Sequence, residues 1–191
     1  VYLFHIFGNT EFANNRANIQ KICVSSTKYL LPLKSMIRKA TYDDISALMD
    51  IFCKAREIMR ACGNTNQWND SYPSEDIVRK DIDSGRCMVL CMNGKPIATM
   101  AFLEGPDPTY AEIYNGNWLN DKPYHVIHRI AAAEPGHNAA KKLLDWGFQR
   151  AASIRIDTHK DNVIMHHILS GYGFTHCGMI LLQNGSPREA Y

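Results

Sequence analysis

The chain has 191 residues, enough for one domain with a full hydrophobic core and short for two. Hydrophobic residues make up 46% and charged residues 21%, as in ordinary globular proteins, and the net charge of +2 gives no sign of a nucleic-acid binder. No apolar run approaches the roughly 20 residues that cross a bilayer. We therefore expect neither a nucleic-acid nor a membrane partner.

The six cysteines form no C-x-x-C pair and show no spacing typical of a disulfide framework. Reduced thiols in a cytoplasmic protein are the simpler interpretation. The apolar residues 1–8 lack a basic leader and a small-residue cleavage site, so we do not expect a signal peptide.

Residues 1–35 show no sustained hydrophobic period, and a clear strand–helix pattern begins at Met36, the first methionine. We expect residues 1–35 to be a poorly ordered N-terminal extension and residues 36–191 to form one domain. Neither an internal repeat nor a linker interrupts residues 36–191.

Hydrophobic period and turn residues predict the elements of that domain. After a strand at 36–40, a helix begins at Thr41 with a T-x-x-D capping box and runs to about Ala61, and a second helix runs from near Ser74 to Gly85. Next come hairpin strands at 86–92 and 96–103, a long connection with a candidate strand at 110–113, a strand at 124–132, a helix at 138–151, a strand at 153–157, a helix at 161–170, and strands at 174–182 and from 188 onward. This order predicts a mixed α/β sheet, first antiparallel and then parallel, with helices on both faces.

The stretch from His128 to Trp146 predicts a buried strand, a tight turn of small residues and a helix. Backbone amides at a helix start are unpaired and the helix dipole favours anions, so such a turn binds phosphate without a charged side chain. The alternative is an ordinary connection kept tight for packing. Lys141 and Lys142 either reach the phosphates or form a solvated face.

Two stretches, HRIAAAEPGHNAAKKLLDW and RIDTHKDNVIMHHILSGYGF, together with the element order, resemble the GNAT superfamily of N-acetyltransferases over residues 36–191. The resemblance implies the GNAT acyl-CoA N-acyltransferase fold, with acetyl-CoA as co-substrate. The family signature R/Q-x-x-G-x-G/A falls on Pro135–Ala140, where only the last small residue is kept and Pro135 lacks an amide donor. Asn138 replaces a glycine, and because asparagine tolerates a left-handed backbone we expect the turn to form.

The resemblance also implies that backbone groups at Ile130 and Ala132 hold the pantetheine arm of acetyl-CoA like an added strand. Asn162 is open to two interpretations, a helix cap or a contact to the cofactor arm. The residues expected at the cofactor are Ile130, Ala131, Ala132, Gly136, His137, Asn138, Ala139, Ala140, Lys141 and Asn162.

His128 is the candidate catalytic base. Regular alternation places His128, Ile130 and Ala132 on one face of the strand, which would bring the imidazole near the reacting amine. Imidazole titrates near neutrality and can take a proton from an ammonium group, and some arylalkylamine-acetylating relatives carry a histidine at the matching position. A hydrogen-bonded core histidine is the alternative. His125 falls on the opposite face, so the pair does not chelate a metal and no metal site is expected.

The family often places a tyrosine, as general acid, seven residues after the helix asparagine. Counted from Asn162, that position is Leu169, and Tyr172 lies three residues later in the predicted turn. The thiolate of coenzyme A would then leave without protein help or be protonated by a residue from elsewhere.

Gln67, Trp68 and Tyr72 lie in the loop between the first two helices, which lines the acceptor pocket in the family, and Trp118 lies in the other long loop. An aromatic and amide pocket suits a small amine better than a long basic tail. The sequence thus predicts a GNAT N-acetyltransferase acting on the primary amine of a small molecule, and leaves a homodimer open. The alternative is a non-catalytic acyl-CoA-binding module of the same fold.

Overall fold

The computed structural model describes residues 35–191, and the predicted N-terminal extension lies outside them except for Ser35. The described elements are β1 (Ser35–Lys39), α1 (Ile45–Ala61), α2 (Glu75–Asp83), β2 (Cys87–Met92), β3 (Lys95–Glu104), β4 (His125–Ala132), α3 (Ala139–Phe148), β5 (Ile154–Thr158), α4 (Val163–Tyr172), β6 (Gly178–Leu181) and β7 (Pro187–Ala190), with short 3-10 turns at Tyr42–Asp44 and Pro108–Tyr110. No helix in this part of the chain is long and apolar enough to cross a membrane.

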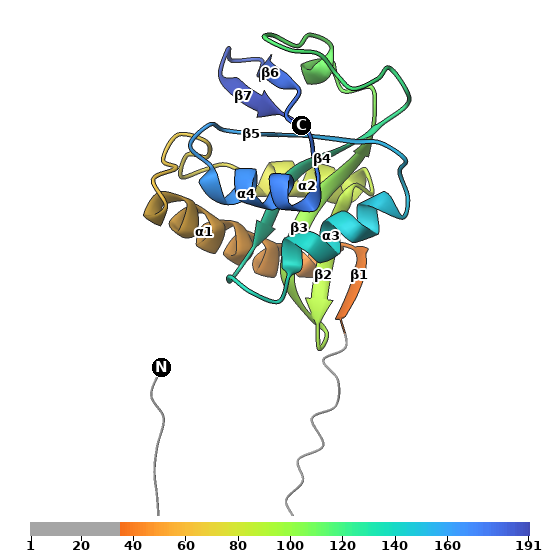
Figure 1. The fold of residues 1–191 in the computed structure, drawn as a ribbon. Coiled ribbons are helices and arrows are strands. Elements are labelled where there is room, and N and C mark those ends of the chain that lie inside the picture. The colour runs from red at the N-terminus through yellow and green to blue at the C-terminus, as the bar shows by residue number, and fades with distance from the viewer. Residues whose placement is uncertain (1–34) are drawn as a thin grey trace, which may run out of the picture. The chain divides into compact units, whose positions relative to one another are not determined.

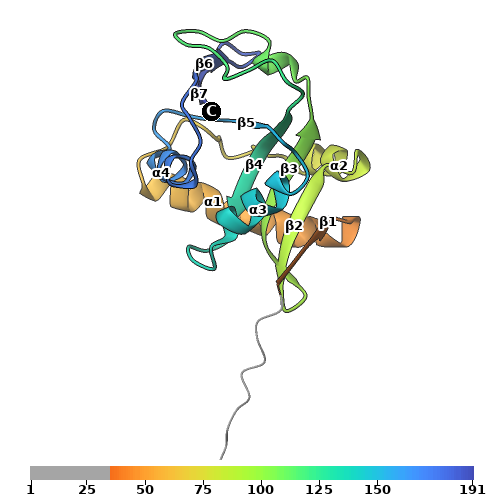
Figure 2. The ribbon, with the colours of Figure 1, turned by 45° about the vertical axis from the view of Figure 1, so that its right-hand side comes forward.

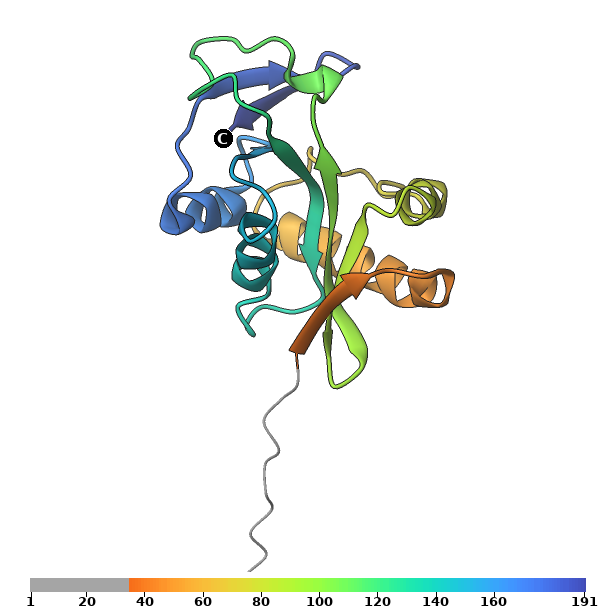
Figure 3. The ribbon, with the colours of Figure 1, turned by 90° about the vertical axis from the view of Figure 1, so that its right-hand side faces the viewer.

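Seven strands form one sheet in the order β1-β2-β3-β4-β5-β7-β6. Only β4 and β5 pair in parallel; the other neighbours are antiparallel. Helices α1 and α2 lie on one face of the sheet and α3 and α4 on the other, as Figure 1 and the view along the sheet in Figure 3 show. The mixed sheet with helices on both faces is therefore confirmed.

Each face of the sheet has its own hydrophobic core. Leu143, Leu144 and Leu169 pack from α3 and α4 onto one face. Leu48 and Phe52 of α1 pack on the other face. Burying a side chain of this size contributes roughly 1.5–3 kcal/mol, so these apolar stripes explain why the helices lie where they do.

The helical stretch begins after Thr41 as predicted, but its first turn is the 3-10 turn Tyr42–Asp44, and α1 itself begins at Ile45. The Asp44 carboxylate accepts the Thr41 backbone N–H at 2.8 Å and is held from the other side by Arg38, with an Nη2–Oδ1 distance of 2.8 Å. This arm of a capping box ties the first turn of the helix to β1.

Several predicted boundaries are wrong. The candidate strand at 110–113 does not form. Tyr110 instead ends a 3-10 turn at Pro108–Tyr110, which starts where the Asp107 carboxylate accepts the Thr109 N–H at 2.8 Å. The helix predicted at 138–151 ends at Phe148, and the strand predicted at 174–182 is only Gly178–Leu181. Helix α4 extends to Tyr172 because Gly173, at φ 103°, supplies the left-handed residue that ends it.

Strand β4 carries one extra residue. Its pairing with β3 passes from Ala101↔His128 to Thr99↔Ala131, and Arg129 adopts φ 53° at the irregularity. Such a bulge reverses the alternation of side chains beyond it.

The prediction that His128, Ile130 and Ala132 share one face is therefore wrong. Ile130 and Ala132 pack on the cluster under α3 and α4. The His128 ring instead lies 5.9 Å from the ring of Tyr110, on the other side of the strand. A sequence with a regular period gives no sign of this reversal.

Candidate active site

A cleft of about 1370 Å³ opens beside β4. The parallel pairing of β4 with β5 ends at Ile127↔Ile156, and beyond it β4 pairs only with β3. Figure 2 shows β5 crossing one end of β4 while the rest of β4 continues beside β3. Successive residues of a strand direct their backbone groups to alternate sides, so part of the backbone of residues 128–132 faces an edge without a partner strand.

The turn before α3 has the conformation that binds anions. Gly136, His137 and Asn138 all have positive φ, at 106°, 54° and 51°. The expectation that Asn138 takes the left-handed conformation of the usual glycine is confirmed. Successive amides in such a turn converge on one point and form an anion-binding concavity.

The amides of this turn are free. Within residues 35–191, no acceptor lies in hydrogen-bond range of the backbone N–H groups of His137, Asn138, Ala140 and Lys141. The Ala139 N–H makes only a long bond, 3.4 Å, to the Gly136 carbonyl. Four unpaired donors at the positive end of a helix are a ready site for phosphate oxygens.

The lysine of the turn is already paired. Lys141 Nζ lies 2.9 Å from the Asp145 carboxylate, one helical turn later. The Tyr172 hydroxyl donates to the same carboxylate at 2.9 Å, and burial together with this bond raises the pKa of Tyr172 to about 12. Leu169, at the family's acid position, is fully buried in the core.

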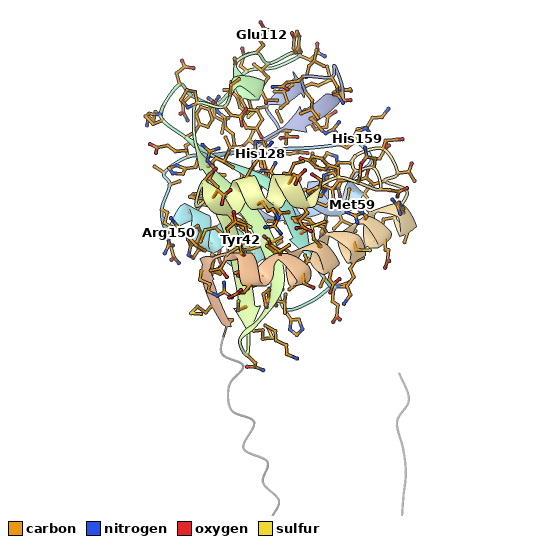
Figure 4. The ribbon with its side chains drawn as sticks, turned by 180° about the vertical axis from the view of Figure 1, so that it is seen from behind. Tyr42, Met59, Glu112, His128, Arg150 and His159 are labelled. Atoms are coloured by element: carbon orange, nitrogen blue, oxygen red, sulfur yellow. The ribbon has the colours of Figure 1, made fainter. Side chains whose placement is uncertain are left out.

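His128 lies between two carboxylates at the cleft wall. Its Nε2 is 2.9 Å from Asp107 Oδ2, and its Nδ1 is 3.6 Å from Asp157 Oδ1. The Tyr110 hydroxyl donates to Asp157 Oδ1 at 2.7 Å. Figure 4 shows His128 well inside the molecule, in contrast to Glu112 at its outer edge.

The charges around His128 follow from this geometry. The hydrogen bond with His128 is the largest influence on Asp107, and it holds the pKa of that carboxyl well below its usual range. Burial raises the pKa of Tyr110 well above its usual value, so its phenol stays protonated and remains a donor to Asp157.

Sequence reasoning missed both carboxylates. Asp157 had a usable signal, because it lies at the carboxyl end of the strand that pairs in parallel with β4. No sequence pattern points to Asp107, since only the path of the loop after β3 brings it to His128.

The loop between α1 and α2 contributes Gln67, Trp68 and Tyr72 to the cleft, as predicted for its position. Trp68 packs edge-on against Phe52 and lies 6.0 Å from the ring of Tyr72. The Tyr72 hydroxyl lies 3.4 Å from Nη1 of Arg129. These contacts hold an aromatic wall opposite β4.

Asn162 caps α4, since its Oδ1 accepts the Met165 N–H at 3.1 Å. Its Nδ2 donates to Gln67 Oε1 at 2.8 Å, which links α4 to the loop after α1. Asn162 also lines the cleft, so the cap and a cofactor contact are compatible.

Two predicted site residues lie outside the cleft lining. Trp118 was expected at the substrate, but its indole N–H donates to the Tyr110 carbonyl at 3.1 Å and its ring stacks on Arg155. His137 belongs to the anion-binding turn through its backbone, whereas it is absent from the cleft wall. Of the residues expected at the cofactor, those that line the cleft besides Asn162 are Ile130, Ala131, Ala132, Gly136, Asn138, Ala139, Ala140 and Lys141.

The chain is similar to solved structures over nearly all of its described length. An acetyltransferase of the GNAT family from Streptococcus agalactiae 2603 is 32% identical, with a TM-score of 0.75, over 82% of this chain and 93% of that one. The chain belongs to the GNAT family of acetyltransferases. It is thus a GNAT-type N-acetyltransferase in family and fold.

More distant acetyltransferase structures share the fold alone. A GNAT acetyltransferase from Listeria monocytogenes 4b F2365 is 18% identical, with a TM-score of 0.60, over 83% of this chain and 95% of that one. The yncA protein of Salmonella typhimurium, solved with its cofactor acetyl-CoA, is 16% identical, with a TM-score of 0.52, over 82% of this chain and 92% of that one. No protein-family model matches the chain, and a comparison with curated proteins finds no match.

Proposed function

We propose that this GNAT protein transfers the acetyl group of acetyl-CoA to the primary amine of a small molecule. The single observation that carries the proposal is the His128 imidazole held by Asp107 at the wall of the cleft, where the unpaired edge of β4 begins. The edge leads from this imidazole to the free amides before α3.

The cleft fits acetyl-CoA by its backbone chemistry. The four free amides at residues 137–141 suit the phosphates, and the open edge of β4 at Ile130–Ala132 suits the amide groups of the pantetheine arm. The Salmonella relative that binds acetyl-CoA has the same fold. When bound, acetyl-CoA would supply an activated thioester.

His128 would act on the amine. The Asp107 carboxylate can only accept, so Nε2 would be the donor to it, and in the neutral imidazole Nδ1 would then carry the lone pair on the side of Asp157. Nδ1 would take the proton that an ammonium group must lose before its nitrogen attacks a carbonyl carbon. In the reaction a C–N bond forms, the C–S bond breaks and the thiolate leaves, and the nitrogen gives up a second proton to solvent or to the departing thiolate.

No residue at the family's acid position serves that thiolate. Leu169 has no proton to give, and the Tyr172 hydroxyl is donated to Asp145. We expect positioning and backbone polarisation of the carbonyl to supply much of the rate.

The degraded signature at Pro135–Ala140 keeps a non-catalytic acyl-CoA-binding module as the second candidate. The partly buried His128–Asp107 pair favours catalysis, because mere binding of acetyl-CoA gives no reason to orient an imidazole at the cleft wall. A cytoplasmic location and a homodimer remain predictions from the sequence.

Release of free thiol from acetyl-CoA in a panel of amines tests the proposal, alongside the shift of melting temperature caused by acetyl-CoA. We expect thiol release that depends on the added amine. A melting shift without thiol release for any amine would leave the binding module as the function.

A further inference from the structure

The last strand places a second charged group at the cleft. Arg188 of β7 is 7% exposed and lines the cleft. An arginine offers five N–H donors in a fixed fork. Within residues 35–191, the guanidinium of Arg188 makes one hydrogen bond, from Nη1 to the neighbouring Pro187 carbonyl at 2.8 Å. Its Nε lies 4.0 Å from Asp157 Oδ2, too far for a hydrogen bond.

The unpaired nitrogens of Arg188 reach the cleft. In the described part of the chain, Asn64 Oδ1 is the only fully buried side-chain nitrogen or oxygen atom without a hydrogen-bond partner. The free nitrogens of Arg188 are therefore not sealed in the core, and the cleft is the space that this buried residue lines. Burial lowers the pKa of the guanidinium, which still remains charged at neutral pH.

A second arginine at the cleft, Arg129, does pair with a carboxylate through two hydrogen bonds. Arg129 donates from Nε and Nη2 to the two oxygens of Asp81, both at 2.9 Å. Arg188 has no such bidentate partner in residues 35–191, because its ion pair with Asp157 is a single contact at 4.0 Å. The fork of Arg188 is left for an anion from outside the chain.

Asp157 sets the spacing between Arg188 and the base. One of its oxygens lies 3.6 Å from His128 Nδ1, and the other lies 4.0 Å from Arg188 Nε. His128 and Arg188 thus lie beside the two oxygens of one carboxylate group, so an amine at His128 and an anion at Arg188 could belong to one small molecule.

Gln67 adds neutral donors to the same wall. Asn162 Oδ1 accepts a backbone N–H, so its Nδ2 must be the donor to Gln67, and the Gln67 atom that faces it must be the oxygen. Thr158, the residue after Asp157, also lies 3.4 Å from that oxygen. The Gln67 NH₂ group has no acceptor among the described residues.

We infer that Arg188 and Gln67 form a carboxylate site in the acceptor half of the cleft, so that the acceptor is an amino acid or a similar small amino carboxylate. This inference rests on the proposed function, whose amine it specifies. A planar, bidentate guanidinium suits a carboxylate by shape as well as by charge.

The test compares each of the standard amino acids with its own carboxamide, which keeps the amine and the side chain but removes the anionic group. We expect at least one amino acid to be acetylated with a kcat/KM about 10- to 100-fold above that of its carboxamide, the range of a charge-assisted hydrogen bond. The amine of a carboxamide is less basic and more often neutral, so intrinsic reactivity works against this result.

Substitutions test whether Arg188 causes the preference for an amino acid over its carboxamide. In Arg188→Met the ratio of amino acid to carboxamide should fall to near one, chiefly through KM, and Arg188→Lys should retain part of it as a point charge. The matched control is Arg150→Met, an exposed arginine that stacks on Trp146 and lies at the edge of the molecule in Figure 4. It should keep the wild-type ratio. An unchanged acetyl-CoA melting shift shows that Arg188→Met is folded.

Calorimetry with the same amino acids and carboxamides, in the presence of coenzyme A, separates the two proposals. A wild-type protein that acetylates neutral amines with no preference for carboxylates overturns the carboxylate site and leaves the acetyltransferase. Amino-acid binding that Arg188→Met abolishes, without thiol release for any amine, supports the site and overturns acetyl transfer. Neither binding nor thiol release overturns both.

Discussion

The carboxylate of Asp107 lies 2.9 Å from Nε2 of His128, although the two residues are 21 positions apart and belong to a loop and a strand. The same aspartate accepts the Thr109 N–H at 2.8 Å, so the turn that follows β3 fixes its position. The loop therefore sets which nitrogen of the imidazole faces the cleft.

Asp107→Asn should lower turnover about 10- to 100-fold, because an amide no longer favours the proton on Nε2 and stabilises an imidazolium less. The loss should appear in kcat more than in KM, and the acidic limb of the pH–rate profile should move to lower pH. An unmoved profile with lowered melting temperature would mean that Asp107 only holds the loop.

His128→Gln should lower turnover about 100-fold or more while the affinity for acetyl-CoA stays nearly intact, since the cofactor is expected to bind backbone groups. The matched control is His125→Gln, in the same strand. His125 stacks on Phe102, with ring centroids 4.7 Å apart, and does not line the cleft. Turnover and melting temperature are measured on the same preparation. Near-normal turnover in a folded His128→Gln protein would remove this residue from the mechanism.

Ala140→Asp should abolish the stabilisation by acetyl-CoA, because a carboxylate would lie beside the free amides and repel phosphate. At 100 times its dissociation constant, a ligand of the native state adds about 2.7 kcal/mol, a readily measured shift of melting temperature. Ala140→Asn is the control, because it has the same size without the charge. If both variants lose the shift equally, crowding and not repulsion explains the effect.

Asp44 should make the free energy of unfolding depend on pH in the acidic range. The hydrogen bond from Arg38 is the largest influence on this buried carboxyl, and its pKa falls from 3.8 to about 2. Above about pH 4 the carboxyl is ionised in both folded and unfolded chains, so its stabilisation is complete there; it is lost as the pH falls toward about 2, because the unfolded chain binds the proton first.

Asp44→Asn should therefore cost about 1.5–3 kcal/mol of unfolding free energy at neutral pH, and the difference from wild type should shrink below about pH 4. Denaturant unfolding at several pH values measures it. The exposed neighbour provides the control, since Asp43→Asn should change little at any of them. A difference that stays constant with pH would show that the Asp44 charge does not carry the effect.

The order of elements was predictable because most segments carry a clean period. The apolar positions of α1 recur at helical spacing, and Asn93-Gly94 marks the β2–β3 turn. The bulge at Arg129 was not predictable, since a positive φ at arginine is unfavourable in isolation. Its side chain is held by Asp81 of α2, a tertiary contact that no local pattern contains.

The candidate site was predictable in part. His128, Gln67 and Tyr72 were found because a strand position and a loop position identify them, and all three line the cleft. Arg188 was not singled out, because its place beside Asp157 depends on β7 lying between β5 and β6, an order that the sequence does not reveal. Trp118 was misplaced because an aromatic residue in a long loop can equally well cover a core, as it does over Tyr110.

The extra residue in β4 joins two half-strands that are out of phase. In the proposed reaction, the half that ends at His128 serves the acceptor, and the half from Ile130 serves the cofactor. Removing Arg129 would bring the halves into phase and would leave Ile130 and Ala132 facing the core under α3 and α4, but it would break the tie to Asp81 and take the bulge out of the strand. The extra residue therefore serves the path of the backbone between the two halves and its tie to α2, and the side chains of each half could keep their facing without it.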